Sequence, residues 1–179
     1  MFSGFFNYDN PVWRFIGKFW DVMVLSFLWL VCSIPIVTIG ASTTAMYYVT
    51  LKLVRDEDGY TFRAFFKSFR ENFKQATIIW CIFMVVGVLL GVDFYFFLKM
   101  YEGSTKFRSA MLAVFCAFMI IYVFMLTYVF PLQSRFVNTV KMTIFNSFFM
   151  SIRHFIQTLG MLVMDGAVIF LALTSMPSV

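Results

Sequence analysis

The sequence contains few of the residues that build metal sites and disulfide frameworks. Its 179 residues include one histidine, His154, and three cysteines, Cys32, Cys81 and Cys116. Each cysteine lies within an apolar run, and none belongs to a C-x-x-C pair. This pattern argues against disulfides and against a zinc site. We therefore expect no metal and no other cofactor.

Charged residues are also scarce. Only 13% of the residues are charged and 61% are hydrophobic, whereas an ordinary soluble domain has about 25% charged residues. So few charges cannot cover an apolar core of this size in water. The composition excludes a water-soluble globule and predicts a single integral membrane domain over residues 1–179. This length holds about four to six crossing helices of ~20 residues each.

Five apolar runs are candidates for crossing helices, at residues 22–40, 41–51, 76–98, 109–134 and 155–173. The second run is short for a straight crossing and follows Pro35 and Gly40. It is either a short span or a re-entrant arm, and the first two runs are expected to form a bent hairpin. The predicted fold is an all-α polytopic bundle.

The basic residues predict the orientation. If the N-terminus is inside and all five runs cross, every lysine and arginine except Lys99, Lys106 and Arg108 lies on the inner side. Short loops rich in basic residues stay in the cytoplasm, so we predict a multi-pass protein of the plasma membrane with its N-terminus inside. This bias and the attraction of anionic lipid explain the net charge of +5 without nucleic acid.

Residues 62–75, FRAFFKSFRENFKQ, have the pattern of an amphipathic helix. Five phenylalanines recur at helical spacing from Phe62 to Phe73, and we expect them on one face. Four basic residues each follow a phenylalanine by one position: Arg63, Lys67, Arg70 and Lys74. Such a helix lies flat at the membrane surface. The alternative is a docking site for a cytoplasmic partner, although the segment lacks the acidic-small-small start expected of a permease coupling loop.

A second cytoplasmic segment, at positions 135–155, repeats part of this pattern at a constant offset along the chain. The matched pairs are Thr44 with Thr127, Lys52 with Arg135, Val54 with Val137, Phe65 with Phe148, Phe66 with Phe149, Ser68 with Ser151, and Arg70 with Arg153. These matches indicate a weak parallel duplication that relates positions 41–98 to positions 124–179. We therefore expect two interfacial helices.

Asp165 lies near the middle of the last apolar run, where an ionised carboxylate is costly. One interpretation is a proton or substrate contact that faces a polar cavity lined by Ser42, Thr43 and Thr44 beside the helix break. The other is a protonated or hydrogen-bonded carboxyl group with a structural role. At the inner edge of the first run, Asp21 is expected to pair with Lys18 at helix spacing.

Gly87 and Gly91 form a G-x-x-x-G pattern in the third run, which allows two helix backbones to approach closely. We interpret it first as packing within the chain and second as a homodimer seam. No pair of nucleophile and base stands at a plausible spacing, and no glycine-rich phosphate loop is present. The sequence therefore predicts a protein that is not an enzyme and has no catalytic residues.

The part of the chain up to Trp80 resembles the YesL-like family of bacterial membrane proteins. The likeness rests on the short aromatic start that ends in tryptophan, the break SIPIVTIGASTTA at positions 33–45, and the helix FFKSFRENFKQA at positions 65–76. The resemblance implies a polytopic protein of the cytoplasmic membrane of Gram-positive bacteria. It also implies that the gene is of a type often found beside genes for carbohydrate ABC importers and two-component sensors. It implies no established activity.

Together these features predict a non-enzymatic accessory or scaffold protein associated with carbohydrate uptake or sensing. It would act through its cytoplasmic amphipathic helices, and its partners would be the lipid bilayer and an ABC importer subunit or a sensor kinase. The rival is a small solute or proton transporter, or a channel, that uses Asp165 and the break at Ser42 to Thr44. Such a pathway would need a homo-oligomer.

Overall fold

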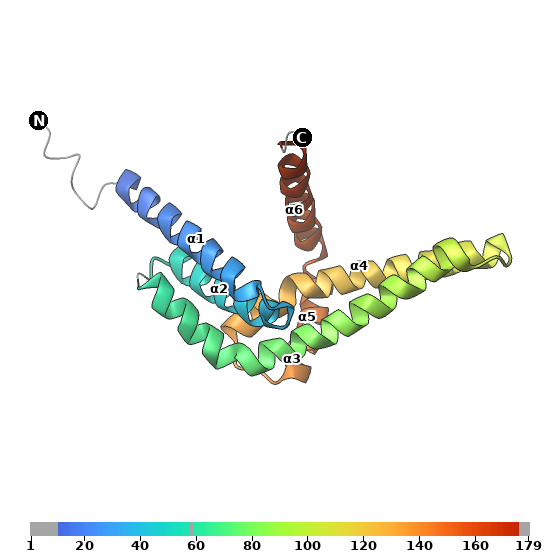
Figure 1. Cartoon of the computed structure of the whole chain (residues 1–179), viewed down its shortest axis with the longest axis horizontal. Coiled ribbons are helices and arrows are strands. Elements are labelled where there is room, and N and C mark those ends of the chain that lie inside the picture. Colours follow the sequence, from blue (N-terminus) through green and yellow to red (C-terminus); the bar gives the residue numbers. More distant parts are fainter. Residues whose placement is uncertain (1–10, 58, 176–179) are drawn as a thin grey trace, which may run out of the picture. The chain divides into compact units, whose positions relative to one another are not determined.

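The computed structural model describes residues 11–57 and 59–175. These residues form the α-helices α1 (Pro11–Ser33), α2 (Ile39–Val54), α3 (Thr61–Tyr95), α4 (Thr105–Arg135), α5 (Val140–Arg153) and α6 (Phe155–Ser175) (Figure 1). A short 3-10 helix, η1 (Ile36–Thr38), precedes α2, and a π-helical turn, η2 (Phe96–Met100), follows α3. The described part of the chain contains no strand, so the all-α class is confirmed.

Three helical segments of the described residues are long and apolar enough to cross a membrane. They are Ile16–Ser33, Thr61–Met100 and Thr105–Arg135, and they overlap the first, third and fourth predicted runs. Helix α2 has 16 residues, fewer than the ~20 of a straight crossing, and Phe155–Met164 is a shorter apolar part of α6. Three such helices indicate a multi-pass membrane protein.

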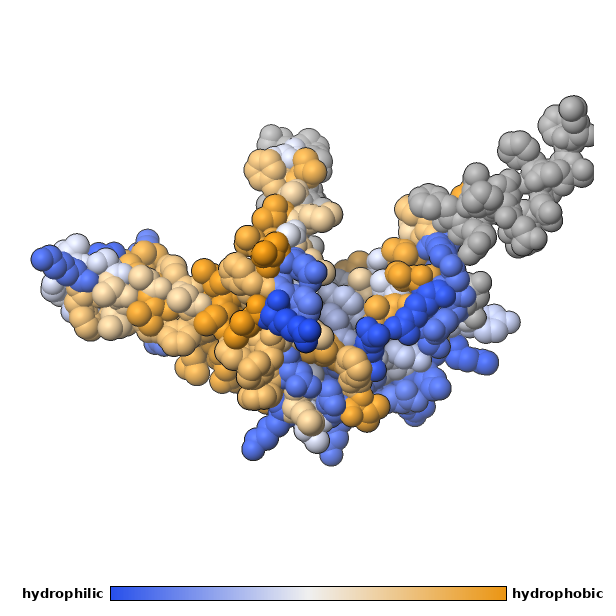
Figure 2. Space-filling model, turned by 180° about the vertical axis from the view of Figure 1, so that it is seen from behind, coloured by the Kyte–Doolittle hydropathy of each residue, from blue (hydrophilic) through white to orange (hydrophobic). Residues whose placement is uncertain are grey.

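The surfaces of the long helices agree with a lipid environment. Only 6% of the most apolar stretch of Thr61–Met100 is buried inside the protein, and the same holds for Thr105–Arg135. Figure 2 shows hydrophobic side chains covering much of the visible face of the distal parts of α3 and α4. Water would not favour so large an apolar surface.

The chain divides into two compact units. The first consists of Met1–Val86 and Phe130–Val140, and the second of Gly87–Val129 and Lys141–Val179. Helices α3 and α4 each contribute residues to both units. The first unit contains the amphipathic segment of α3. The single membrane domain over residues 1–179 stays a prediction.

The break between α1 and α2 falls where the sequence predicts it, between Pro35 and Gly40. Pro35 has no N–H group to donate and disfavours the helical conformation of Ile34, so α1 ends at Ser33. The hydroxyl oxygen of Thr38 lies 2.6 Å from the carbonyl oxygen of Cys32, so it satisfies a carbonyl that the ended helix leaves open.

The core of the first unit forms where α1, α2 and α3 meet. Leu25 and Leu28 of α1, Ala45 and Val49 of α2, and Phe65 of α3 form one buried cluster. This cluster fixes which side of α3 faces inward.

Helices α2 and α3 approach closely at Gly40. A Cβ atom at this position would lie 2.6 Å from the carbonyl oxygen of Ala76 and 2.6 Å from the Cβ atom of Trp80. The indole N–H of Trp80 also donates to the carbonyl oxygen of Ile36 at 2.8 Å. Only glycine fits this contact, so Gly40 of the SIPIVTIGASTTA segment allows α2 to pack closely against α3.

Helix α2 ends in a Schellman-type turn. The N–H groups of Asp56 and Glu57 donate to the carbonyl oxygens of Leu53 and Lys52 at 3.4 and 3.2 Å, and Asp56 has a φ of 55°. Asp56 thus occupies the left-handed position at which glycine is usual.

The expected pair of Lys18 with Asp21 is wrong. The ammonium group of Lys18 lies 2.5 Å from the carboxylate of Asp56, and the hydroxyl of Thr61 donates to Asp21 at 2.7 Å. Both carboxylates therefore connect α1 to the turn between α2 and α3. Partners from other elements replace the local partner because this turn folds back onto α1.

The amphipathic segment and the third apolar run form one helix, α3, with 35 residues. The prediction of two separate helices is therefore wrong. No glycine or proline occurs between Thr61 and Val86 to end the helix. Figure 1 shows that α3 instead changes direction in its first half.

In the second unit, described residues at the start of α6 contact α4. The rings of Phe124 and Phe155 lie 5.3 Å apart, and the hydroxyls of Tyr128 and Thr158 form a hydrogen bond of 2.9 Å. The hydroxyl of Thr158 lies 2.9 Å from the carbonyl oxygen of His154. A buried threonine thus joins the start of α6 to α4.

Candidate functional site

The candidate site is the first part of α3, where three stripes of side chains run along the helix. Successive residues of an α-helix are rotated by about 100°, and residues three or four apart share a face. The core stripe consists of Thr61, Phe65, Ser68 and Ala76, all buried, with Asn72 partly buried between them. This stripe faces the α1–α2 hairpin.

The phenylalanine stripe lies one residue further round the helix. It consists of Phe62, Phe66, Phe69 and Phe73, of which only Phe69 is partly buried. Phe62 is 60% exposed and Phe66 is 40% exposed, whereas Phe65 is completely buried. The prediction that all five phenylalanines share one exposed face is therefore wrong for Phe65, because α1 and α2 cover its side of the helix.

The basic stripe lies a further residue round, about 200° from the core stripe. Its members Arg63, Lys67, Arg70 and Lys74 are all exposed. Among the described residues none of the four forms an ion pair, and the guanidinium of Arg63 lies 5.9 Å from the centre of the Tyr60 ring. The four cations therefore leave a net positive face directed away from the core.

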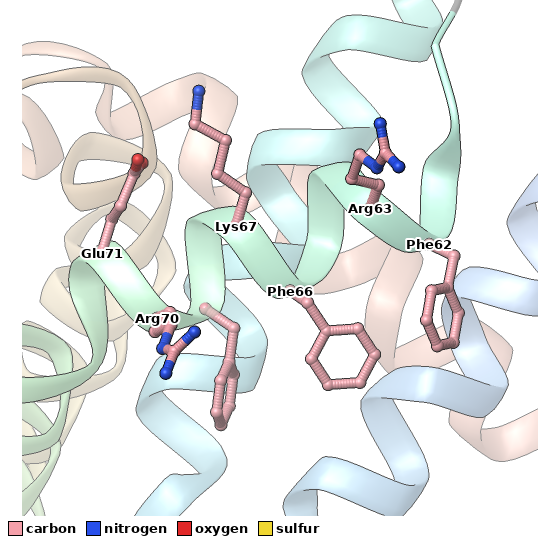
Figure 3. A pocket seen from close by; sticks show the side chains of 7 residues that line it. Phe62, Arg63, Phe66, Lys67, Arg70 and Glu71 are labelled. Atoms are coloured by element: carbon pink, nitrogen blue, oxygen red, sulfur yellow. The ribbon is translucent and has the colours of Figure 1, made fainter.

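The phenylalanine and basic stripes line an open groove of ≈ 940 Å³. Every residue that lines it belongs to α3: Phe62, Arg63, Phe66, Lys67, Phe69, Arg70 and Glu71. Figure 3 shows Arg63, Lys67 and Glu71 on one side of the helix, and Phe62, Phe66 and Arg70 on the other. Arg70 thus brings a positive charge to the phenylalanine side, which the spacing alone did not predict.

Side-chain amides hold this part of α3 in its orientation. The amide of Asn72 donates to the carbonyl oxygen of Ser68 at 3.1 Å, and the buried Gln133 of α4 donates to Asn72 at 3.4 Å. The amide of Gln75 donates to the carbonyl oxygen of Asn138. Sequence patterns did not predict these contacts, although Asn72 continues the spacing of the core stripe.

The three hydroxyls predicted to line a polar cavity are bonded within the first unit. Ser42 and Thr44 are completely buried. The hydroxyl of Ser42 shares a 2.7 Å hydrogen bond with Ser33, Thr43 accepts from the indole N–H of Trp29 at 3.1 Å, and Thr44 donates to the carbonyl oxygen of Gly40 at 2.8 Å. These residues therefore join α1 to α2 and stabilise the start of α2.

Asp165 belongs to α6, but its side chain lies outside the described residues. Its predicted contact with the hydroxyls at Ser42 to Thr44 stays a prediction.

The two glycines of the G-x-x-x-G pattern differ in their surroundings. A Cβ atom at Gly87 would lie 2.6 Å from the hydroxyl oxygen of Tyr122 in α4, whereas nothing lies within 4 Å of a Cβ atom at Gly91. Gly87 thus leaves room for the side chain of Tyr122 within the same molecule. The surface at Gly91 is open, and the predicted homodimer seam stays a prediction.

Comparison with known proteins assigns no activity to these features. No curated protein matches the chain, and no solved structure matches it. The YesL-like resemblance of the chain up to Trp80 stays a prediction. One family model does match, over residues 22–94, which include the second half of α1, all of α2 and nearly all of α3. This part of the chain is similar to the family described as "Protein of unknown function, DUF624".

Proposed function

We propose that this protein is a non-enzymatic accessory component of a membrane assembly, which it contacts through the phenylalanine and basic stripes of α3. One observation carries the proposal. The core stripe holds α3 against the α1–α2 hairpin, so the helix presents four exposed cations and three exposed phenylalanines in a fixed orientation.

The chemistry of the groove favours a protein partner with acidic groups beside apolar ones. Aromatic residues and arginine are enriched in protein interfaces, and both kinds line this groove. Because its lining comes from one helix, the groove is open on its other side to another molecule. An arginine forms two parallel hydrogen bonds to a carboxylate, which gives such a contact direction as well as affinity.

We place the contact in the cytoplasm and the protein in a bacterial plasma membrane. Five crossings with the N-terminus inside leave only Lys99, Lys106 and Arg108 outside, in agreement with the positive-inside rule. The break at Pro35 supports a hairpin in which α2 returns to the inner side. In this topology the amphipathic part of α3 begins on the cytoplasmic side.

The assembly is proposed to serve carbohydrate uptake or its sensing. This step rests on the resemblance to the YesL-like family, whose members are often encoded beside carbohydrate ABC importers and two-component sensors. An importer subunit or a sensor kinase is therefore the proposed partner.

The test is photocrosslinking in intact membranes from a photoreactive residue at position 66, which lies in the groove. We expect capture of an importer subunit or a sensor kinase. Replacement of Arg63, Lys67, Arg70 and Lys74 by glutamine should reduce this capture about tenfold, since four exposed ion pairs of about 0.2–1 kcal/mol each would be lost. Undiminished capture by the glutamine variant would contradict the proposal.

A matched control removes charge elsewhere in the chain. Lys99→Gln with Lys106→Gln lowers the net charge without touching the groove, and we expect capture to stay unchanged. Crosslinks to lipid alone would contradict the proposed protein partner and would indicate that the groove contacts the membrane surface.

The transporter hypothesis makes the opposite prediction for Asp165. An accessory protein should leave the solute and proton permeability of reconstituted vesicles at the level of empty vesicles, and Asp165→Asn should change nothing. Flux that Asp165→Asn abolishes would favour the transporter, and flux that survives would remove Asp165 from its mechanism.

A further inference from the structure

A second cavity of the first unit lies where α2 and α4 end. It has a volume of ≈ 230 Å³ and is lined mainly by Tyr48, Lys52, Arg55, Glu57, Ser134 and Arg135. Lys52 belongs to the last turn of α2, and Arg135 is the last residue of α4. Two segments that are distant in the sequence therefore bring cations to one small cavity.

The cations of this cavity outnumber its carboxylates. Glu57 lies 3.9 Å from the guanidinium of Arg55. Lys52 and Arg135 form no ion pair with any described residue; each lies beside an aromatic ring, with Lys52 5.1 Å from the centre of Tyr48 and Arg135 5.5 Å from that of Phe136. Like charges that line one cavity repel each other, and a bound anion relieves the repulsion.

Helix dipoles explain part of this pattern but not all of it. The C-terminal end of a helix attracts a cation to its own last turn, which accounts for Lys52 and Arg135 separately. It does not require the ends of two helices to share one cavity, or Arg55 to join them from the turn. The Schellman-type turn holds Arg55 and Glu57 at this place.

The sequence adds a second observation. Lys52 and Arg135 each stand at the same distance before a phenylalanine, Phe62 or Phe145, that opens the motif F-x-x-F-F-x-S-x-R. They are therefore matched positions in the predicted duplication, and both line the same cavity.

We propose that this cavity binds a phosphate group. Lysine and arginine together offer several charge-assisted donors to a tetrahedral oxyanion, and the hydroxyl of Tyr48 makes no hydrogen bond within the described residues. The volume lies below the ~300–1,000 Å³ of pockets for drug-sized ligands, so it suits a single phosphate group. That group belongs either to an anionic phospholipid or to a small phosphorylated molecule.

The position of the cavity favours the lipid as the source. Arg135 ends the apolar helix Thr105–Arg135, and the end of a crossing helix lies at the level of the headgroups. Basic pockets between helices on the cytoplasmic side bind anionic headgroups in other membrane proteins. The site uses none of the four residues of the basic stripe, so its test is independent of the test of the proposed accessory function.

Binding to the full-length protein in neutral detergent micelles tests the proposal. The probes are short-chain phosphatidylglycerol, short-chain phosphatidylcholine and inorganic phosphate, and the readout is protection of Lys52 from an amine-acylating reagent, measured by mass spectrometry. We expect phosphatidylglycerol to slow the modification of Lys52 at least ~5-fold while Lys106 is unaffected, because a bound anion holds the ammonium group. Phosphatidylcholine should have no effect.

Inorganic phosphate distinguishes the two sources. Protection at equal concentrations by phosphate and by phosphatidylglycerol would assign the site to a free phosphorylated molecule, whereas protection by the lipid alone would assign it to the headgroup. No protection of Lys52 by either probe would overturn the proposal.

Two variants complete the test. Arg135→Gln should raise the concentration of phosphatidylglycerol needed for half-maximal protection of Lys52 about tenfold, since it removes a cation that lines the same cavity, and Arg135→Lys should leave this concentration nearly unchanged. An unchanged concentration in Arg135→Gln would also overturn the proposal. Protection in the wild-type protein does not depend on either variant, so a variant that fails to fold leaves the main test intact.

Discussion

The two segments that share the motif F-x-x-F-F-x-S-x-R differ in charge and in burial. Their ring geometry is nearly the same: Phe62 and Phe66 lie 4.8 Å apart and Phe145 and Phe149 lie 4.6 Å apart, with interplanar angles of 55° and 54°. Helical spacing alone produces this likeness.

The cations separate the two segments. Arg63 and Lys67 of α3 correspond to Asn146 and Met150 of α5, and only Arg70 has a basic counterpart, Arg153. The phenylalanines are thus common to both segments, whereas the full row of four cations occurs only on α3. This difference is why we assign the partner contact to α3.

The largest expected effect concerns burial. Phe65 is completely buried against the hairpin, whereas its counterpart Phe148 is half-buried. Phe65→Ala should lower the free energy of unfolding by about 3–5 kcal/mol, and Phe148→Ala should lower it by clearly less. Chemical unfolding in detergent micelles, followed by tryptophan fluorescence, measures both. Equal losses would remove the distinction between the two segments.

A graft of charge tests whether position matters as well as sign. In the variant with glutamine at Arg63, Lys67, Arg70 and Lys74, Asn146→Arg and Met150→Lys add cations to α5. We expect partner capture to stay about tenfold below wild type, because three of the lost cations, Arg63, Lys67 and Arg70, line the groove on α3 and the new cations on α5 do not. Restored capture would show that total charge is sufficient and that the orientation of α3 is not needed.

The smallest expected effect concerns the turn before α3. Lys18 and Asp56 are 39% and 50% exposed, so their ion pair is screened by solvent. Lys18→Met should lower the free energy of unfolding by about 0.2–1 kcal/mol, and added salt should shrink the difference. The loop before α5 is held by the bond from Gln75 to Asn138 instead, so Gln75→Leu, measured in the same way, should show no such salt dependence.

The position of Phe65 shows that sequence spacing does not predict which side of a helix is buried by its neighbours. Its spacing with Phe62 and Phe69 predicts a shared helix face, but α1 and α2 cover the side of the helix on which Phe65 lies and leave Phe62 exposed. A helical wheel describes one helix and contains no information on the neighbour that covers it. The same reason explains why the contact of Asn72 with Gln133 was missed, since the two residues belong to different helices.

The helical class, the apolar character of the long helices, the break at Pro35 and the spacing of the stripes on α3 were all predictable from neighbouring residues. Hydropathy, proline and periodicity can be read along the chain. Packing between helices is what buries Phe65 in the core, joins Lys18 to Asp56, and brings Lys52 and Arg135 to one cavity. These contacts join residues far apart in the chain, and their geometry exists only after the helices have packed.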